Sequence, residues 1–204
     1  MDDLAPVPSG WRGARGDFAH YCKVHGARTA LQRLLVLIRA PAVWALFVYR
    51  LGRTAHFGGP RPRWKALPLK LLYAVCVEVA RHATGVLVHN WAELEHDVWL
   101  ESFAPIMVGA KRIRSGARIH GGVTLGAGGP REARGVPDIG HGVVVCPGAT
   151  IVGPVRVPDG SVIGPNTLLT HSPAAQAAWV GVPAMRWKRD PSLLVPAFPQ
   201  RSAA

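Results

Sequence analysis

The sequence predicts an α+β fold in which an N-terminal helical region precedes a parallel β-solenoid with one projecting loop. Apolar residues recur at helix spacing before residue 84 and at every sixth position after it. This change of period divides the chain into a helical region (1–83), a solenoid domain (84–185) and a C-terminal tail (186–204). With 204 residues, 49% of them apolar, the chain can bury a sizeable core, so we expect a folded protein.

Three segments of the first region have a helical pattern. Apolar residues at helix spacing mark residues 31–38, and Pro41 starts a second segment that contains "WALFVY". A third apolar helix is expected at 69–82, after the breaker-rich connection 56–68. Helices this apolar need a partner surface, so we expect them to pack on the solenoid or on another subunit rather than to serve a membrane role. The uncharged stretch 40–49 is too short to span a bilayer, and no membrane span is predicted.

The six-residue period is the strongest signal in the chain. Six apolar residues follow one another at this step without a break: Ile139, Val145, Ile151, Val157, Ile163 and Leu169. Four earlier residues keep the same step, and two more resume it after a shift of one residue: Val88, Leu94, Leu100 and Ile106, then Ala117 and Val123. Glycine, proline and asparagine lie between these positions, as triangular coils of three short strands require. A helical repeat is excluded because its period is 3.5 or 3.6.

One segment, "GAGGPREARGVPD" (126–138), interrupts the repeat. An excursion of this length from a solenoid projects outward, and such loops often carry function.

Charge and cysteine content limit the possible partners. The net charge is +12, and residues 1–84 hold 13 of the 24 basic residues but only 4 of the 12 acidic ones. Such a field attracts anionic partners, among them a phosphate-rich cofactor. We expect no nucleic-acid function, because no stacked-aromatic platform or glycine-rich RNA signature accompanies the charge. Cys22, Cys76 and Cys146 form no CxxC or Cys/His pair, so neither a disulfide frame nor a metal site is expected. The start "MDDLAPVPSG" lacks the pattern of a secretory signal, and we expect a cytoplasmic protein.

Four stretches resemble one enzyme family. They are "TGVLVHNWAELEHDVWLES", "GGVTLG", "GVPDIGHGVVVCPGATIVGPV" and "VGVPAMRW", and they resemble serine acetyltransferases and related hexapeptide-repeat O-acetyltransferases. The resemblance covers residues 84–185 with one single-residue deletion near Lys111, and "WALFVYRLGR" resembles the family's N-terminal helices. It implies a left-handed parallel β-helix, a homotrimer or a hexamer of paired trimers, an active site between subunits, and acetyl-CoA as the acyl donor.

The family's catalytic residues are substituted in this chain. The resemblance implies an Asp-His pair whose histidine takes the proton from the acceptor hydroxyl, but this pair falls on Glu101 and Ser102. The acid that orients the family histidine falls on Leu87, and a further histidine of the projecting loop falls on Val136. A serine hydroxyl cannot act as a general base near neutral pH.

Two other histidines are candidates for the missing base. "LEHDV" offers Glu95 and His96 one rung before the family pair, and His120 in "RIHGG" stands beside the "GGVTLG" strand near the base of the projecting loop. His89 and His141 also occupy solenoid positions, where a histidine is more often a solvated surface residue.

The positions that the family uses for the cofactor are better preserved. Five small residues match positions along the pantetheine arm: Gly126, Ala127, Gly148, Ala149 and Gly164. Tight turns of a β-helix demand small residues as well, so the match discriminates poorly. Arg186 and Lys188 in "MRWKR" resemble the segment that could meet the nucleotide phosphates, and a solvated tail explains them equally well.

Three functional hypotheses follow. The first is an acyl-CoA-dependent acyltransferase acting on a hydroxyl or amine of a small molecule or saccharide, with His120 or His96 as base or with a nucleophilic acceptor that needs little help. The second is a catalytically inactive paralogue that serves as an oligomeric scaffold or partner-binding subunit. The third is a recruiting module whose basic helical region engages another protein or an acidic carrier.

Overall fold

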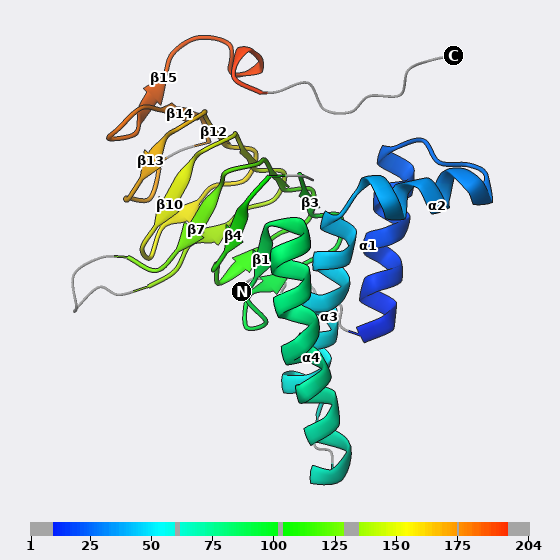
Figure 1. The fold of residues 1–204 in the computed structure, drawn as a ribbon. Helices are drawn as coiled ribbons and strands as arrows, with labels where there is room; N and C mark the ends of the chain where they lie inside the picture. The colour runs from blue at the N-terminus through cyan, green and yellow to red at the C-terminus, as the bar shows by residue number, and fades with distance from the viewer. Residues whose placement is uncertain (1–9, 60–61, 102–103, 129–134, 175, 196–204) are drawn as a thin grey trace.

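The computed structural model describes residues 10–59, 62–101, 104–128, 135–174 and 176–195 (Figure 1). Four helices come first: α1 (Gly10–Val24), α2 (Ala30–Arg39), α3 (Ala42–Phe57) and α4 (Arg63–Thr84). Thr29 starts α2 with a capping box, in which its hydroxyl accepts from Gln32 N and the Gln32 side chain accepts from Thr29 N. Gly85, in the left-handed conformation with φ +70°, ends α4.

The helical pattern was predicted in part. Residues 31–38 and the segment after Pro41 are helical as expected. However, α1 was not predicted, and α4 begins at Arg63, so the connection 56–68 is shorter than its breaker residues suggest. Pro68 is accommodated inside α4, near its start. Within the described residues no single helix is long and apolar enough to cross a membrane, although α2 and α3 together meet these criteria across an 82° bend.

Fifteen short strands follow in the described residues. Their bounds are β1 (Val86–Val88), β2 (Glu93–Leu94), β3 (Trp99–Leu100), β4 (Ile106–Val108), β5 (Arg112–Ile113), β6 (Arg118–Ile119), β7 (Thr124–Gly126), β8 (Asp138–Ile139), β9 (Val144–Val145), β10 (Thr150–Val152), β11 (Arg156–Val157), β12 (Val162–Ile163), β13 (Leu168–Leu169), β14 (Ala178–Val180) and β15 (Met185–Trp187). The chain then forms a 3-10 turn, η2 (Pro191–Leu193).

The strands form three parallel sheets, and each of the first four coils gives one strand to each sheet. Their orders are β1-β4-β7-β10-β13, β2-β5-β8-β11 and β3-β6-β9-β12-β14, with β15 added antiparallel to β14. From β1 to β13 every third strand returns to the same sheet, and β14 then follows β12, which confirms the predicted parallel β-solenoid. The predicted loop leaves after β7 and returns at β8, and Gly128 and Gly135 form a bridge at its base. Residues 129–134 lie outside the described part.

The interior of the solenoid is built from the predicted repeat. All six residues of the run from Ile139 to Leu169 are buried, with at most 1% of their surface exposed. In the second coil, the register places Val108 opposite both Val88 and Leu125. Ile106, together with Ala117 and Val123, is buried but belongs to a second inward row two residues earlier. These three residues keep the six-residue step without lying in the row of Val88, Val108 and Leu125, because a two-residue insertion after Leu100 shifts the register.

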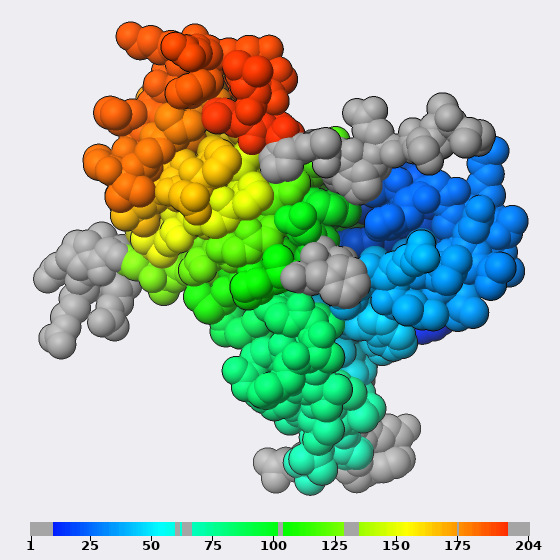
Figure 2. All heavy atoms as spheres, turned by 45° about the horizontal axis from the view of Figure 1, so that its top comes forward, coloured from blue at the N-terminus to red at the C-terminus, as the bar shows by residue number. Residues whose placement is uncertain are grey.

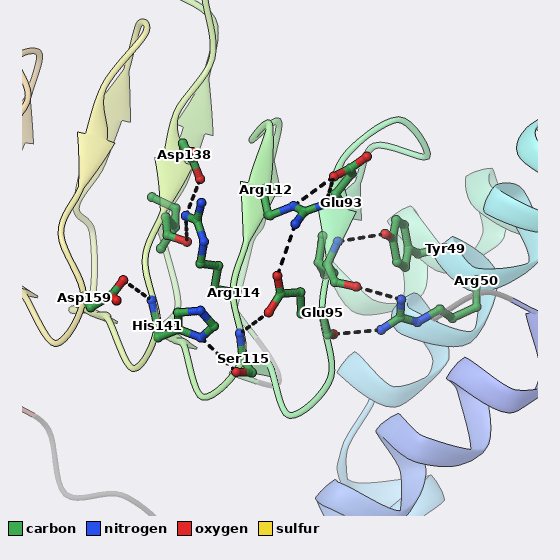
Figure 3. Close-up of polar contacts among 12 residues, drawn as sticks. Tyr49, Arg50, Glu93, Glu95, Arg112, Arg114, Ser115, Asp138, His141 and Asp159 are labelled. Atoms are coloured by element: carbon green, nitrogen blue, oxygen red, sulfur yellow. Dashed lines mark hydrogen bonds and ion pairs between the residues drawn. The ribbon is translucent and has the colours of Figure 1, made fainter. Parts of the chain in front are cut away.

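The helical region covers the first coil of the solenoid, as Figure 1 shows. The Tyr49 hydroxyl donates to Ala92 O and accepts from Leu94 N, and the Tyr21 hydroxyl makes the corresponding pair of bonds with Leu100. Arg50 donates to the carbonyls of Leu94 and Glu95, as Figure 3 shows. These side chains satisfy backbone groups that an exposed sheet edge would leave unpaired.

A buried ion pair fixes this cap. Arg50 Nε lies 2.8 Å from Asp17 Oδ2, and both side chains are almost fully buried. Because the same guanidinium reaches the carbonyls of the first coil, α1, α3 and the solenoid are joined through one residue. The prediction that the helices pack on the following region is confirmed for α1 and α3. It fails for much of α2 and α4, where apolar residues such as Leu31, Ile38 and Leu71 are more than half exposed.

Candidate functional site

His120 lies at a corner of the β-helix, directly after β6. Only 2% of its surface is exposed, and the Trp99 ring packs edge-on against the imidazole, with 5.2 Å between ring centroids. Its backbone N donates to Val145 O of the next coil, which holds the residue in the ladder. The sequence places a histidine here, and the fold encloses it in an apolar setting.

Glu101 is the charged neighbour of His120. Leu100 and Ile119 are paired across β3 and β6, so the residues that follow them lie next to each other on consecutive coils. Glu101 Oε2 lies 3.5 Å from His120 Nδ1, and the same oxygen accepts a hydrogen bond from Gly121 N. The carboxylate is thus anchored by the backbone and directed at the imidazole.

The surroundings keep His120 neutral. Burial is the main cause that lowers its pKa, the nearby Arg118 lowers it as well, and the Glu101 carboxylate raises it in part. Among the described residues, His120 Nε2 has no hydrogen-bond partner, whereas Nδ1 faces the Glu101 carboxylate. A buried polar group without a partner requires an explanation, and a catalytic or ligand-binding role is one. A neutral imidazole beside a carboxylate has the composition of a general base.

The structure does not bring Glu95 and His96 together. His96 is 64% exposed, and its Nδ1 lies 3.1 Å from Asp97 Oδ2. The Glu95 carboxylate is buried and points elsewhere, accepting from Ser115 N and lying 3.5 Å from Arg112. Glu95 therefore ties two coils together, and His96 is a solvated corner residue.

The remaining family positions contribute little to a catalytic site. Leu87 is half-buried in β1, where its register partner on the next coil is Met107. Val136 lies just before β8 and is half-buried. Ser102 lies outside the described residues. Of the four substituted positions, Glu101 is the one whose described side chain contacts His120.

The small residues predicted for the cofactor fall into two groups. A Cβ at Gly148 would collide with the Asn166 side chain, and a Cβ at Gly164 would collide with the Val180 side chain. Ala149 is fully buried in the core. The packing of neighbouring coils thus explains these three residues without a ligand.

The other group is open to a ligand. A Cβ at Gly126 would meet only the end of the Met107 side chain, at 3.8 Å, and Ala127 is exposed. Arg186 in β15 and Lys188 just after it are also exposed. Their charges are available to an anion.

A charged outer face was missed at the sequence level. The register aligns Glu93, Arg112, Asp138 and Arg156 across one sheet, as acid and base in alternation. Figure 3 shows part of this row together with Ser115, whose hydroxyl lies 3.0 Å from His141 Nδ1. A cavity of about 580 Å³ adjoins the row. The alternation becomes visible only once the three-strand coil length is known, because the partners are 18 to 26 residues apart.

The chain has relatives among known proteins. No family model matches it. The serine acetyltransferase of Staphylococcus xylosus is 25% identical over 178 residues, which cover 86% of this chain and 76% of the relative. The serine acetyltransferase of Mycobacterium tuberculosis is 29% identical over 158 residues, which cover 77% of this chain and 64% of the relative.

Solved structures agree on the fold. Neisseria gonorrhoeae serine acetyltransferase superposes with a TM-score of 0.65 at 22% identity, covering 87% of this chain and 67% of that one. Soybean serine acetyltransferase complexed with serine gives 0.66 at 20% identity, covering 86% and 70%. A serine acetyltransferase in complex with CoA gives 0.62 at 24% identity, covering 86% and 69%. The chain therefore resembles serine acetyltransferases in sequence, and its solenoid is the left-handed parallel β-helix of these structures.

Proposed function

We propose that the chain is an acyl-CoA-dependent acyltransferase that uses acetyl-CoA and transfers the acetyl group to a hydroxyl or amine of a small molecule or saccharide. The observation that carries the proposal is the buried, neutral His120 beside Glu101 in a β-helix that resembles serine acetyltransferases. One of the similar structures is a complex with CoA, which supports the choice of donor.

In this proposal His120 is the general base. Its free ring nitrogen takes the proton from the acceptor hydroxyl as the oxygen attacks the thioester carbonyl. The tetrahedral intermediate then collapses, the carbon–sulfur bond breaks, and the imidazolium returns the proton to the departing thiolate. Glu101 stabilises the imidazolium, and because its side chain is 38% exposed, it gives the buried pair contact with solvent.

Further residues complete the site. We assign Gly126 and Ala127 to the pantetheine arm, since a Cβ at Gly126 would meet only the end of the Met107 side chain and Ala127 is exposed. Arg186 and Lys188 are assigned to the nucleotide phosphates, because both are exposed and cationic. We expect a cytoplasmic homotrimer or hexamer with the active site between subunits, following the resemblance.

The first test is calorimetric titration of the purified chain with acetyl-CoA, followed by thiol-release assays with serine, other small alcohols, amines and saccharides. Saturable binding and thiol release with one acceptor class are expected. Replacing His120 with Asn should lower kcat by about 10² to 10⁴. His96→Asn is the matched control and should retain the wild-type rate. Loss of activity in His96→Asn with an active His120→Asn would assign the base to His96 instead.

A second function is favoured by a different observation. Leu87 and its register partner Met107 make the surface apolar where the resemblance implies an orienting acid. An inactive scaffold subunit would show no thiol release with any acceptor. Installing the family residues, Leu87→Asp with Ser102→His, tests this alternative. Serine acetylation by the double variant alone would mean that the fold retains the substrate sites and lacks only the base.

A further inference from the structure

The exposed side of α2 is apolar. Three of its residues at helix spacing are more than half exposed: Leu31 (67%), Leu34 (55%) and Ile38 (68%). Among the residues of this helix only Val36 is buried. A helix of ten residues with an exposed apolar face gains little stability from packing on the rest of the chain. This face lacks a partner in the described part of the chain.

The apolar surface continues onto α1 and α3. Trp44 Nε1 donates to Leu37 O at 2.7 Å, which joins α3 to α2, and the Trp11 ring lies 6.3 Å from the Phe47 ring. Between the three helices lies a groove of about 380 Å³. Its apolar lining includes Trp11, Ala14, Phe18, Leu37, Trp44 and Phe47, and Arg15 also lines it. Figure 2 shows these helices, coloured blue, on the side of the molecule away from the last coils.

The charge around this surface has one sign. Six cationic residues of the segment 10–57 are exposed: Arg12, Arg15, Lys23, Arg28, Arg33 and Arg39. The one acidic residue of this segment is Asp17, which is buried against Arg50. No acidic side chain of α1, α2 or α3 is therefore left to neutralise the exposed cations.

Contrary to the expectation from the sequence that these helices serve no membrane role, we infer that the helical surface formed by α1, α2 and α3 docks on the anionic headgroup surface of a phospholipid bilayer. Proteins bind an anionic bilayer surface through exposed apolar side chains that are surrounded by cations and accompanied by tryptophans at the interface. A second copy of the chain docked through this same helical surface would place its cations face to face, so self-association through this surface is disfavoured. A nucleic acid would match the cations but would leave Leu31, Leu34 and Ile38 without a partner.

The helix geometry fits docking in the plane of the bilayer surface. Leu31, Leu34 and Ile38 are oriented outward and would enter the headgroup region. Arg15, at the groove, and Arg39, at the end of α2, would then reach lipid phosphates. This inference is independent of the acyltransferase proposal, since it uses neither His120 nor acetyl-CoA.

The test is co-sedimentation of the full chain with vesicles of phosphatidylcholine alone and of phosphatidylcholine mixed with phosphatidylglycerol. We expect the chain to bind the mixed vesicles and to bind vesicles of phosphatidylcholine alone only weakly. Binding to the mixed vesicles should decrease as the salt concentration is raised. Leu31→Ser with Ile38→Ser should lower the partition coefficient by about tenfold or more. Arg33→Gln with Arg39→Gln should lower it by about fivefold for each charge removed.

A matched control comes from α4. Leu71 and Val75 form a similarly exposed apolar pair (66% and 57%), so Leu71→Ser with Val75→Ser should leave vesicle binding unchanged. Circular dichroism and thermal melting check that each variant is folded, which is expected because all the changed side chains are exposed. The inference is overturned by equal binding to both vesicle types, by no binding, or by loss of binding in the α4 variant alone. Protein that high salt cannot release would indicate insertion of α2 and α3 and would also overturn surface docking.

Discussion

Glu101 Oε2 lies 3.5 Å from His120 Nδ1, and the two residues are held on consecutive coils by the pairing of β3 with β6. The carboxylate also accepts from Gly121 N, so its position does not depend on the imidazole. The pair therefore combines a buried, neutral base with a fixed negative charge. A proton gained by His120 would be stabilised by Glu101 and opposed by burial.

Replacing Glu101 with Gln should shift the pH dependence of the reaction. Glu101 raises the pKa of His120 against the effect of burial, so its removal lowers this pKa further. Because the neutral imidazole is the active form, the acid limb of kcat/KM should move to lower pH. The plateau should fall as well, because the imidazolium formed during the reaction loses its partner. Measuring kcat/KM between about pH 5 and 8 checks this. An unmoved acid limb would show that His120 does not titrate in the reaction.

Burial of His120 should also make the fold sensitive to acid. Its pKa is lowered in the folded state, so the unfolded state binds more protons as the pH falls through about 6.5. Stability is thus full above that pH and decreases below it. His120→Asn should flatten this decrease in part, since burial also lowers the pKa values of His20 and His25. Urea unfolding between about pH 5 and 7.5 measures the slope. The exposed His96→Asn is the control, and a wild-type slope in both variants would contradict the expectation.

The sequence was most informative about the solenoid interior. The period of six follows from geometry, because every coil turns an apolar residue inward in each of three strands, and burial of the run from Ile139 to Leu169 confirms it. The insertion after Leu100 was missed because Ile106 is apolar as well and occupies the neighbouring inward row. Helix α1 was missed because it contains three glycines, so that packing of Tyr21 and Cys22 rather than local propensity accounts for it.

The candidate site was predictable only in part. His120 was named from the sequence, but Glu101 was recognised only as a substituted position. The two residues are 19 apart, and their contact depends on the coil length, which the insertion after Leu100 alters. Glu95 and His96 are adjacent in the sequence, yet the corner of the coil directs them to different partners. The register between strands decides which side chains are in contact in a β-helix, and a local sequence motif does not reveal this register.

Breaking the buried pair of Asp17 and Arg50 should destabilise the protein strongly. Asp17→Asn leaves a guanidinium that is only 1% exposed without its carboxylate, which costs about 3–5 kcal/mol of unfolding free energy. Urea denaturation measures the loss. The control is Glu78→Gln, which removes an exposed pair with Arg81 and should cost less than about 1 kcal/mol. Equal losses in the two variants would show that the buried pair of Asp17 and Arg50 contributes no more to stability than an exposed pair.

Gly148→Ala distinguishes a structural glycine from a cofactor contact. Gly148 has φ +72°, and a Cβ there would collide with the Asn166 side chain, so the variant should lose about 1–3 kcal/mol of stability. Gly16→Ala is the matched control, because Gly16 lies within α1 with no atom near its added Cβ, and this change should stabilise by about 0.5–1 kcal/mol. Thermal unfolding and acetyl-CoA titration of both variants separate the two roles. A stable Gly148→Ala protein that no longer binds acetyl-CoA would assign this turn to the cofactor, whereas reduced stability with unchanged affinity would assign it to coil packing.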